Sequence, residues 1–319
     1  MAQVENKKIS NDGFTMSCEF KDFPVSFVNA LRRIVLANIP TVVVRDVTIL
    51  ENTTQLPHEM LKHRMEMLPI YIQPNDSSLV KDTKIELKIK ADKDRIVTTD
   101  DFKVESRKEG ILMKDRDFGT PLLFLHLRQG ESVHVTAGLS IENDNVSQVC
   151  VSTTKYHIDP ELVKGARKKF EESGQDVRIF DNTLQQKYYS RDERGRANWF
   201  DFLIESIGVV KSEDILKMGV KILQKKMDEY IREALENIQK ESDPGTCNVT
   251  LEQGGHTIGY LMQEVIYSDA NVKFVSYDVP HPLKNTMVLR WNSEKSPESI
   301  LKNAQELIKE YCSVVEKIL

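Results

Sequence analysis

The sequence lacks the basic surplus that a free-standing nucleic-acid-binding protein usually carries. Its 319 residues contain 44 Lys and Arg against 49 Asp and Glu, a formal net charge of −5. Because phosphate neutralisation dominates the affinity of such proteins, direct DNA or RNA binding is not expected to be its main role. No apolar run approaches the roughly 20 residues that a membrane-spanning helix needs. We therefore expect a soluble, intracellular protein with no membrane contact.

Cysteines are also few, and none has a close neighbour. Cys18, Cys150, Cys247 and Cys312 lie far apart in the sequence. A structural zinc site needs ligands that are paired within a few residues so that they can converge on a tetrahedron. We therefore expect reduced, mostly buried thiols and no cofactor.

The hydrophobic pattern predicts the same succession of strand, helix, strands and long helix twice. In the first copy, Phe14–Phe20 alternates as a strand, Phe23–Asn38 has a helical stripe, and Ser212–Lys240 has the longest helical stripe. In the second copy the final helix begins at Ser296, with Pro297 at its first position. A duplicated α+β architecture follows from this order.

The composition between these elements sets the predicted domain boundaries. Alternating segments such as Lys84–Lys90 predict a mainly-β domain inserted into the first module. Residues 159–196 are charged and irregular apart from a predicted helix over Pro160–Glu172. The boundaries are 1–73 and 197–240 for the first module, 74–158 for the insert, 159–196 for an irregular connection, 241–246 for a linker, and 247–319 for the second module.

The second module is too small to bury its apolar final helix well by itself. Packing that helix against the 212–240 helix around a pseudo-dyad would bury both stripes. The predicted module–module interface consists of Leu216, Val220, Leu223, Met227, Ile300, Ala304, Leu307, Tyr311 and Val314.

Several motifs carry a family resemblance. Phe27–Leu36, with the sequence Phe-Val-Asn-Ala-Leu-Arg-Arg-Ile-Val-Leu, and the segment from His63 and Arg64 to Pro69 resemble the α-like subunits of RNA polymerase. These are the bacterial α subunit, the archaeal D subunit and the third subunit of the eukaryotic nuclear enzyme. The second module is similar instead to the eleventh eukaryotic subunit and the archaeal L subunit, through His256, Thr257, Gly259, His281 and Pro282.

The resemblance implies two α-subunit-type dimerisation modules, each an antiparallel sheet with packed helices, paired within one chain. The implied function is a non-catalytic assembly platform of a multisubunit DNA-directed RNA polymerase. Its partners would be the largest and second-largest subunits and small zinc-binding subunits, with DNA reached only through the complex. The resemblance implies that Arg32 and Arg33 contact the second-largest subunit. Small side chains on the same helix, such as Asn29, would allow that subunit to approach closely.

The same resemblance bears on metals and on origin. Some relatives hold zinc or an iron–sulfur cluster in the insert, but residues 74–158 contain only Cys150. A single chain carrying both subunit types resembles the arrangement in large DNA viruses. A viral protein acting in the host cytoplasm or nucleus, or packaged in the virion, is therefore the expectation.

Two alternatives remain open from the sequence. One is a stand-alone homodimeric interaction module outside a polymerase. The other is a metal-dependent hydrolase using His58, Glu59, His63 and His281, although His58 and His63 are five residues apart and diverge by about 140° on a helix. The metalloprotease motif instead needs two histidines that are four residues apart, on one face of the helix.

Overall fold

The computed structural model describes residues 2–143, 149–252, 255–284 and 286–319. The chain forms two compact units. Unit 1 comprises Met1–Val35, Ser152–Ile204 and Leu216–Leu319, and unit 2 comprises Leu36–Val151 and Glu205–Ile215. Among the helices of the described residues, none combines the length and the apolar character needed to cross a membrane.

The first sheet of unit 1 has the strand order β1-β2-β10-β9. Its strands are β1 (Gln3–Ile9), β2 (Thr15–Lys21), β10 (Trp199–Ser206) and β9 (Cys150–Tyr156). Alternation in β2 buries Met16, Cys18 and Phe20 on one face. That face packs toward α1 (Val25–Ala37). The ring of Phe20 lies 5.2 Å from that of Phe23, which in turn lies 5.3 Å from the ring of Phe27 in α1. β1 was not predicted, because this edge strand buries no side chain and so has no hydrophobic signal.

The second sheet of unit 1 has the order β11-β12-β14-β13. Its strands are β11 (Gln239–Lys240), β12 (Thr246–Leu251), β14 (Met287–Ser293) and β13 (Val272–Asp278). Helix α7 (His256–Tyr267) packs on β13 and β14. The last helix, α8 (Pro297–Glu316), begins after Ser296, whose side chain accepts a hydrogen bond from the Ser299 N–H at 3.2 Å.

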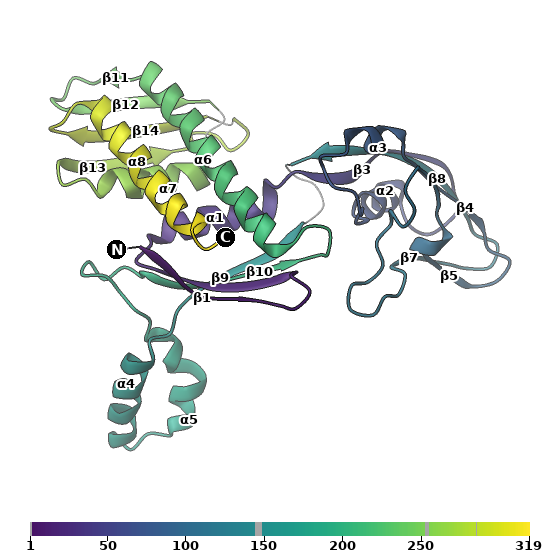
Figure 1. Cartoon of the computed structure of the whole chain (residues 1–319), viewed down its shortest axis with the longest axis horizontal. Helices are drawn as coiled ribbons and strands as arrows, with labels where there is room; N and C mark the ends of the chain where they lie inside the picture. Colours follow the sequence, from purple (N-terminus) through teal and green to yellow (C-terminus); the bar gives the residue numbers. More distant parts are fainter. Residues whose placement is uncertain (1, 144–148, 253–254, 285) are drawn as a thin grey trace. The chain divides into compact units, whose positions relative to one another are not determined.

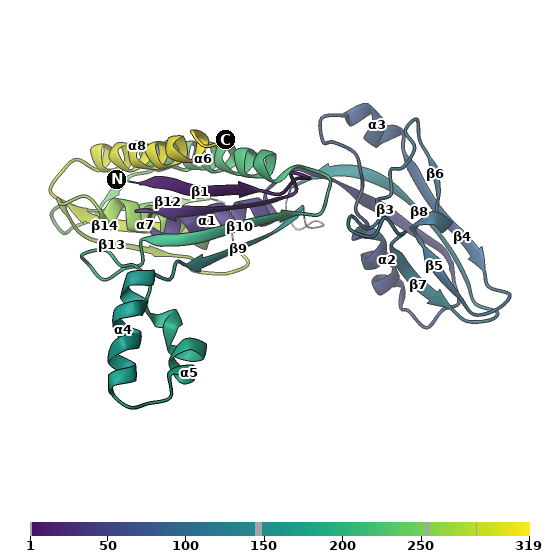
Figure 2. The same ribbon diagram turned by 60° about the horizontal axis from the view of Figure 1, so that its bottom comes forward.

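The long helix α6 (Ser212–Glu236) lies beside α8 (Figures 1 and 2). The sequence predicted a helix to Lys240, but the structure ends it at Glu236 because Gln239 and Lys240 pair with Asn248 and Cys247. Residues 241–245, within the predicted linker, are therefore the turn of a β-hairpin.

Residues 159–189 of unit 1 form a small helical hairpin. It contains α4 (Pro160–Glu172), α5 (Val177–Ile179), η2 (Phe180–Leu184) and η3 (Gln185–Lys187). The predicted helix over Pro160–Glu172 is present as α4, and the side chain of Asp159 accepts hydrogen bonds from the Glu161 and Leu162 N–H groups at its start. The core of the hairpin is thin: the buried ring of Phe180 lies 5.6 Å from Phe170 and 5.5 Å from Tyr188.

Unit 2 contains a four-stranded sheet and a two-stranded ribbon. The sheet has the order β3-β8-β4-β6, with β3 (Thr41–Asn52), β8 (Ser132–Glu142), β4 (Lys84–Lys90) and β6 (Lys103–Glu105). The ribbon pairs β5 (Arg95–Thr98) with β7 (Leu123–Leu127). The helices are α2 (His58–Glu66), α3 (Ser77–Asp82) and the short η1 (Thr99–Asp101).

The position of β3 differs from the predicted division of the chain. We expected residues 1–73 to belong to the first module, but β3 pairs with β8 of the insert, from Thr41 opposite Glu142 to Asn52 opposite Val133. Leu61 and Met65 of α2 share the core of unit 2 with Leu87 and Val135. A strand needs a neighbouring strand for its backbone hydrogen bonds, and for β3 that neighbour is β8 of the insert.

The four cysteines provide a test of the two cores. All four are buried, and burial raises the pKa of Cys18, Cys150 and Cys312 to about 12. Because the thiolate is the nucleophile, we expect almost no reaction with a disulfide reagent in the native state at mildly alkaline pH. Unfolding in guanidinium chloride should release all four thiols. Rapid labelling of any native thiol would contradict this assignment of the core.

Candidate functional site

In unit 1, helix α6 crosses α1 at a glycine. A Cβ atom on Gly219 would lie 2.6 Å from Val35 Cγ1 and 3.5 Å from Leu31 Cδ1. The two helices therefore approach more closely than a side chain at this position allows. The predicted α6 stripe is fully buried along its length, at Leu216, Val220, Leu223 and Met227.

Helix α8 reaches α1 through an aromatic cluster. The ring centroid of Tyr311 lies 5.5 Å from Phe23 and 5.4 Å from Phe27, and both phenylalanines are buried. Tilted ring pairs at this separation contribute about 0.5–1.5 kcal/mol beyond the area that they bury. Leu307, one turn before Tyr311, lines the small cleft beside this cluster.

The predicted α8 stripe is buried to different degrees. Ile300 and Ala304 are buried, whereas Leu307, Tyr311 and Val314 are half-buried. The fully buried positions of the C-terminal half are Ile308, Cys312 and Val315. Each of these follows a predicted position by one residue, a rotation of about 100° on the helix. Tyr311 nevertheless meets the first module directly.

A polar contact also joins α6 to α8. Asp228 accepts hydrogen bonds from Gln305 and from Lys309 Nζ, the latter at 3.0 Å. Desolvation of Asp228 would raise its pKa, but these hydrogen bonds and the Lys309 charge hold the pKa below its ordinary value. The stabilisation is therefore present above the ordinary carboxyl pKa and is lost as the pH falls through the lowered one.

Helices α1 and α7 exchange polar contacts at both ends. Arg33 Nε of α1 donates to Thr257 Oγ1 of α7 at 2.7 Å. In the other direction, Glu264 Oε2 of α7 accepts from the Ser26 N–H of α1 at 3.1 Å. Arg196 Nη1 donates to the second oxygen, Glu264 Oε1, at 3.3 Å. Glu264 thus places a carboxylate at the N-terminus of α1, where the helix dipole favours negative charge.

The residues predicted to meet the second-largest subunit already have partners in the chain. Arg33 contacts Thr257, and Arg32 donates from Nε and Nη2 to Asn29 Oδ1 at 3.2 and 2.9 Å. Arg33 is exposed on the surface of unit 1. Docking of another subunit on Asn29, Arg32 and Arg33 stays a prediction.

The family-motif residues fall in both units. In unit 2, Arg64 Nε donates to the Phe124 carbonyl at 2.8 Å, and His63 and Pro69 line a groove together with it. In unit 1, His256 Nδ1 lies 3.4 Å from Tyr277 Oη, and His281 Nδ1 accepts from the Leu283 N–H at 3.1 Å.

Thr257, Gly259 and Pro282 complete the motif set in unit 1. Thr257 and Gly259 lie in the first turn of α7, and Pro282 is exposed in the turn after β13. Gly259 lies so close to β13 and β14 that a Cβ there would be 2.5 Å from the Tyr277 ring and 2.6 Å from Met287 Sδ.

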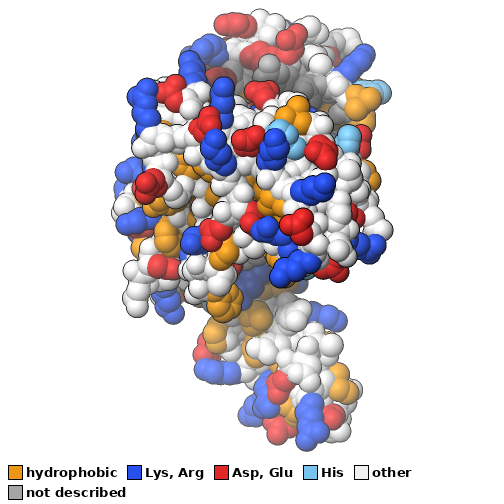
Figure 3. Space-filling model, turned by 90° about the vertical axis from the view of Figure 1, so that its right-hand side faces the viewer, with side chains coloured by type: hydrophobic (Ala, Val, Ile, Leu, Met, Phe, Trp, Pro, Cys, Tyr) orange, Lys and Arg blue, Asp and Glu red, His pale blue; other side chains and the backbone are white. Residues whose placement is uncertain are grey.

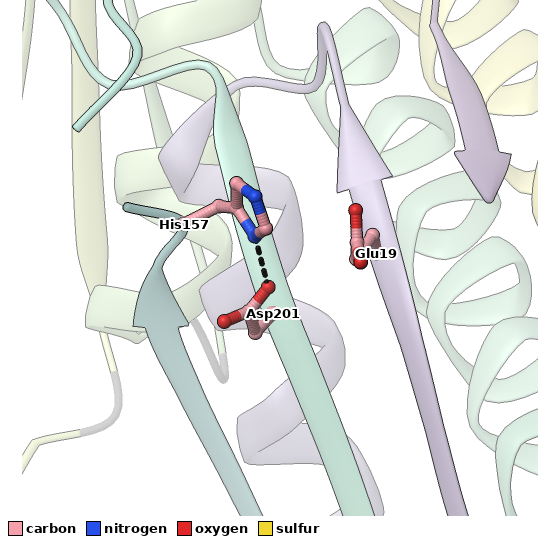
Figure 4. Close-up of side chains that lie close together, drawn as sticks. All are labelled: Glu19, His157 and Asp201. Atoms are coloured by element: carbon pink, nitrogen blue, oxygen red, sulfur yellow. Dashed lines mark hydrogen bonds and ion pairs between the residues drawn. The ribbon is translucent and has the colours of Figure 1, made fainter. Parts of the chain in front are cut away.

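Sequence reasoning missed one group of side chains, Glu19, His157 and Asp201. They meet on the face of the first sheet opposite its core, and their possible ligand atoms lie within 4.8 Å of one another (Figure 4). His157 Nδ1 is 2.6 Å from Asp201 Oδ1, and Trp199 Nε1 donates to Glu19 Oε2 at 3.1 Å. These residues come from segments that are far apart in the sequence, so no spacing motif reveals them. The one available signal was that Glu19 and Asp201 occupy polar positions in strands whose apolar and polar residues alternate.

One imidazole nitrogen and two carboxylates are ligand types that a divalent cation accepts. Here they already satisfy one another, with Lys155 Nζ 3.4 Å from Asp201 Oδ2. In the part of the chain that the structure describes, this is the only such group, and it contains none of His58, Glu59, His63 and His281. The hydrolase alternative therefore gains no support from the geometry.

Surface charge does not favour nucleic-acid binding on the face shown in Figure 3. Lys and Arg side chains alternate there with Asp and Glu, and hydrophobic side chains lie between them. An extended basic field, the electrostatic footprint of a nucleic-acid-binding face, is not visible on it.

Two models of one protein family match this chain. The description "RNA polymerase Rpb3/Rpb11 dimerisation domain" applies to two models that match this chain, one over residues 17–227 and one over residues 246–317. The first match runs through residues of both units, and the second lies within unit 1.

Two relatives that are similar to about two thirds or more of this chain are named as RNA polymerase subunits. The chain is 27% identical to DNA-directed RNA polymerase subunit Rpo3 of Pyrococcus furiosus over 261 residues, 73% of this chain and 98% of the relative. It is 28% identical to DNA-directed RNA polymerases I and III subunit rpac1 of Dictyostelium discoideum over 257 residues, 64% of this chain and 74% of the relative. The α+β fold class predicted from the sequence is confirmed. Since one family model spans more than half of the sequence, the chain belongs to the family of RNA polymerase Rpb3/Rpb11 dimerisation domains.

Proposed function

We propose that this chain is a non-catalytic assembly platform of a multisubunit DNA-directed RNA polymerase. The observation that carries the proposal is the presence of two dimerisation-domain matches in one chain. Their pairing within unit 1 is supported by the α6–α8 contact at Asp228 and by the Tyr311 cluster. In this reading the two modules, one similar to the third and one to the eleventh subunit, form internally the pair that other polymerases build from two chains.

Catalysis would reside on other chains. The sequence has no Asp-x-Asp-Gly-Asp metal-binding motif of the kind found in a polymerase catalytic centre. The proposed partners are the largest and second-largest subunits together with small zinc-binding subunits, and DNA would be met only through the assembled enzyme. The second-largest subunit would dock on the α1 surface around Asn29, Arg32 and Arg33. A viral source, with action in the host cell or the virion, is the corresponding proposal for origin.

Capture of the intact tagged chain from its native source tests this function. We expect two very large subunits to be recovered in near-stoichiometric amounts.

Gly165→Ala is a suitable control because a Cβ at Gly165 meets no atom within 4 Å, so this variant should recover the same subunits. Gly219→Val, which disturbs the α1–α6 crossing, should lose them. Recovery of the native chain alone, or only with a second copy of itself, would favour the stand-alone homodimeric module instead.

A further inference from the structure

Helices α1 and α7 occupy equivalent places in the two modules. Counted from Val25, Ser26 is the second and Arg33 the ninth residue of α1. Counted from His256, Thr257 is the second and Glu264 the ninth residue of α7. In both directions the ninth side chain of one helix bonds the second residue of the other. The contacts are thus related by pseudo-twofold symmetry, but their charges are opposite.

We propose that Arg33 and Glu264 make the first module pair with the second module rather than with another copy of itself. This inference rests on the internal pairing proposed above. An isologous interface places the same residue at both ends of the helix pair. Here one end carries a guanidinium and the other a carboxylate. A self-pair of the first module would therefore place Arg33 at both ends, and a self-pair of the second module would place Glu264 at both ends.

Self-pairing of the first module would meet a specific conflict at Ser26. An Arg33 from a second copy would take the place of Glu264, and Ser26 Oγ could accept from it, as Thr257 Oγ1 does now. The Ser26 N–H, in a residue only 1% exposed, would however lose its carboxylate acceptor. The incoming guanidinium would also face Arg196, which now bonds Glu264, and the positive end of the α1 dipole.

The second module suffers no such conflict on its own. In its self-pair, Glu264 would face Thr257, a hydroxyl that can donate, at a helix N-terminus that favours an anion. When two chains exchange their internal pairs for self-pairs, however, they form one pair of first modules and one pair of second modules. The cost at Ser26 and Arg196 therefore disfavours the whole exchange, which is specificity by repulsion rather than by added attraction.

Exchanging the two charges should reverse this preference. In Arg33→Glu/Glu264→Arg, internal pairing would put Arg at Ser26 and Arg196, whereas self-pairing would put Glu there and Arg at Thr257. The double variant keeps the composition of charges and the formal net charge of −5. Tagged and untagged full-length chains are unfolded together, refolded, and the tagged chain is captured. We expect at least about tenfold more untagged chain with the double variant than with the native sequence, because like charges placed together across an interface disfavour the wrong pairing.

Single variants provide the controls. Arg33→Glu makes both ends acidic and removes the discrimination, so intermediate capture is expected. Arg32→Glu reverses the neighbouring charge, whose guanidinium bonds Asn29 of its own helix, and this variant should be captured at the native level. If the double variant does not refold, the proposal is tested by comparing the amount of untagged chain captured with Arg33→Glu and with Arg32→Glu.

Equal capture by Arg33→Glu and Arg32→Glu, or a double variant that refolds without self-association, would overturn the specificity assignment. Self-association of the native chain, dependent on its concentration, would instead overturn the internal pairing on which the proposal rests. The two failures are therefore distinguishable.

Discussion

Gly219→Val is expected to lower the free energy of unfolding by about 3 kcal/mol, the upper part of the range for an overpacked core. The valine Cβ would stand 2.6 Å from Val35 Cγ1, and its methyl groups would add to the overlap. For a structural unit of this size, the melting temperature should fall by about 6–12 °C. Thermal unfolding followed by circular dichroism measures the change.

The crossing can be tested with a smaller, reversible change. Gly219→Ala brings only the Cβ, and Val35→Ala removes the methyl group that it meets. The double variant should therefore be more stable than the sum of the single effects predicts, by about 1 kcal/mol or more. Gly165→Ala in α4 is the matched control, since its Cβ meets open space and should stabilise the helix by up to about 1 kcal/mol. If Gly219→Ala were as harmless as Gly165→Ala, the close approach of α6 to α1 would be wrong.

Trp291→Ala is expected to cost about 3–5 kcal/mol, as truncations of buried aromatic residues do. Trp291 lies on β14, the strand between β12 and β13, and is fully buried. Its replacement leaves a cavity beside the sheet that forms the core of a small module. Urea unfolding of the full chain, followed by far-UV circular dichroism, gives the loss.

Trp291→Phe should cost much less, below about 2 kcal/mol. Among the described residues, Trp291 Nε1 has no hydrogen-bond partner, so phenylalanine forfeits no hydrogen bond there. Trp199→Phe is the informative comparison, because Trp199 Nε1 donates to Glu19 at 3.1 Å and the variant loses that bond. The sequence has only these two tryptophans, so each single variant also leaves one fluorescent reporter. Similar losses for Trp291→Phe and Trp291→Ala would mean that the indole N–H has a polar partner.

Local signals in the sequence were sufficient for elements that carry their own caps and stripes. The helix over Pro160–Glu172 has the predicted bounds because Asp159 and Pro160 fix its start. The α6 stripe is buried because a long helix with one apolar face is most stable when that face lies in the core. The repeated order of strands and helices likewise follows from local periodicity.

Elements defined by distant partners could not be predicted in the same way. β1 has no buried residue and exists through its pairing with β2. β11 has two residues and is a strand only because β12 lies beside it. The Arg33–Thr257 contact joins residues 224 positions apart, so family resemblance alone assigned Arg33 to another subunit.

The hairpin of β11 and β12 has a consequence for how the two modules can be separated. Its strand β11 follows α6 directly, yet it forms the edge of the second sheet. Arg290 of β14 forms an ion pair with Glu241, and Gly245 sits where a Cβ would be 2.7 Å from the Ser293 carbonyl. A protease cut in the turn would leave β11 with the first fragment but still bound in the sheet of the second. A fragment produced without β11 would instead expose the backbone edge of β12, a template for aggregation.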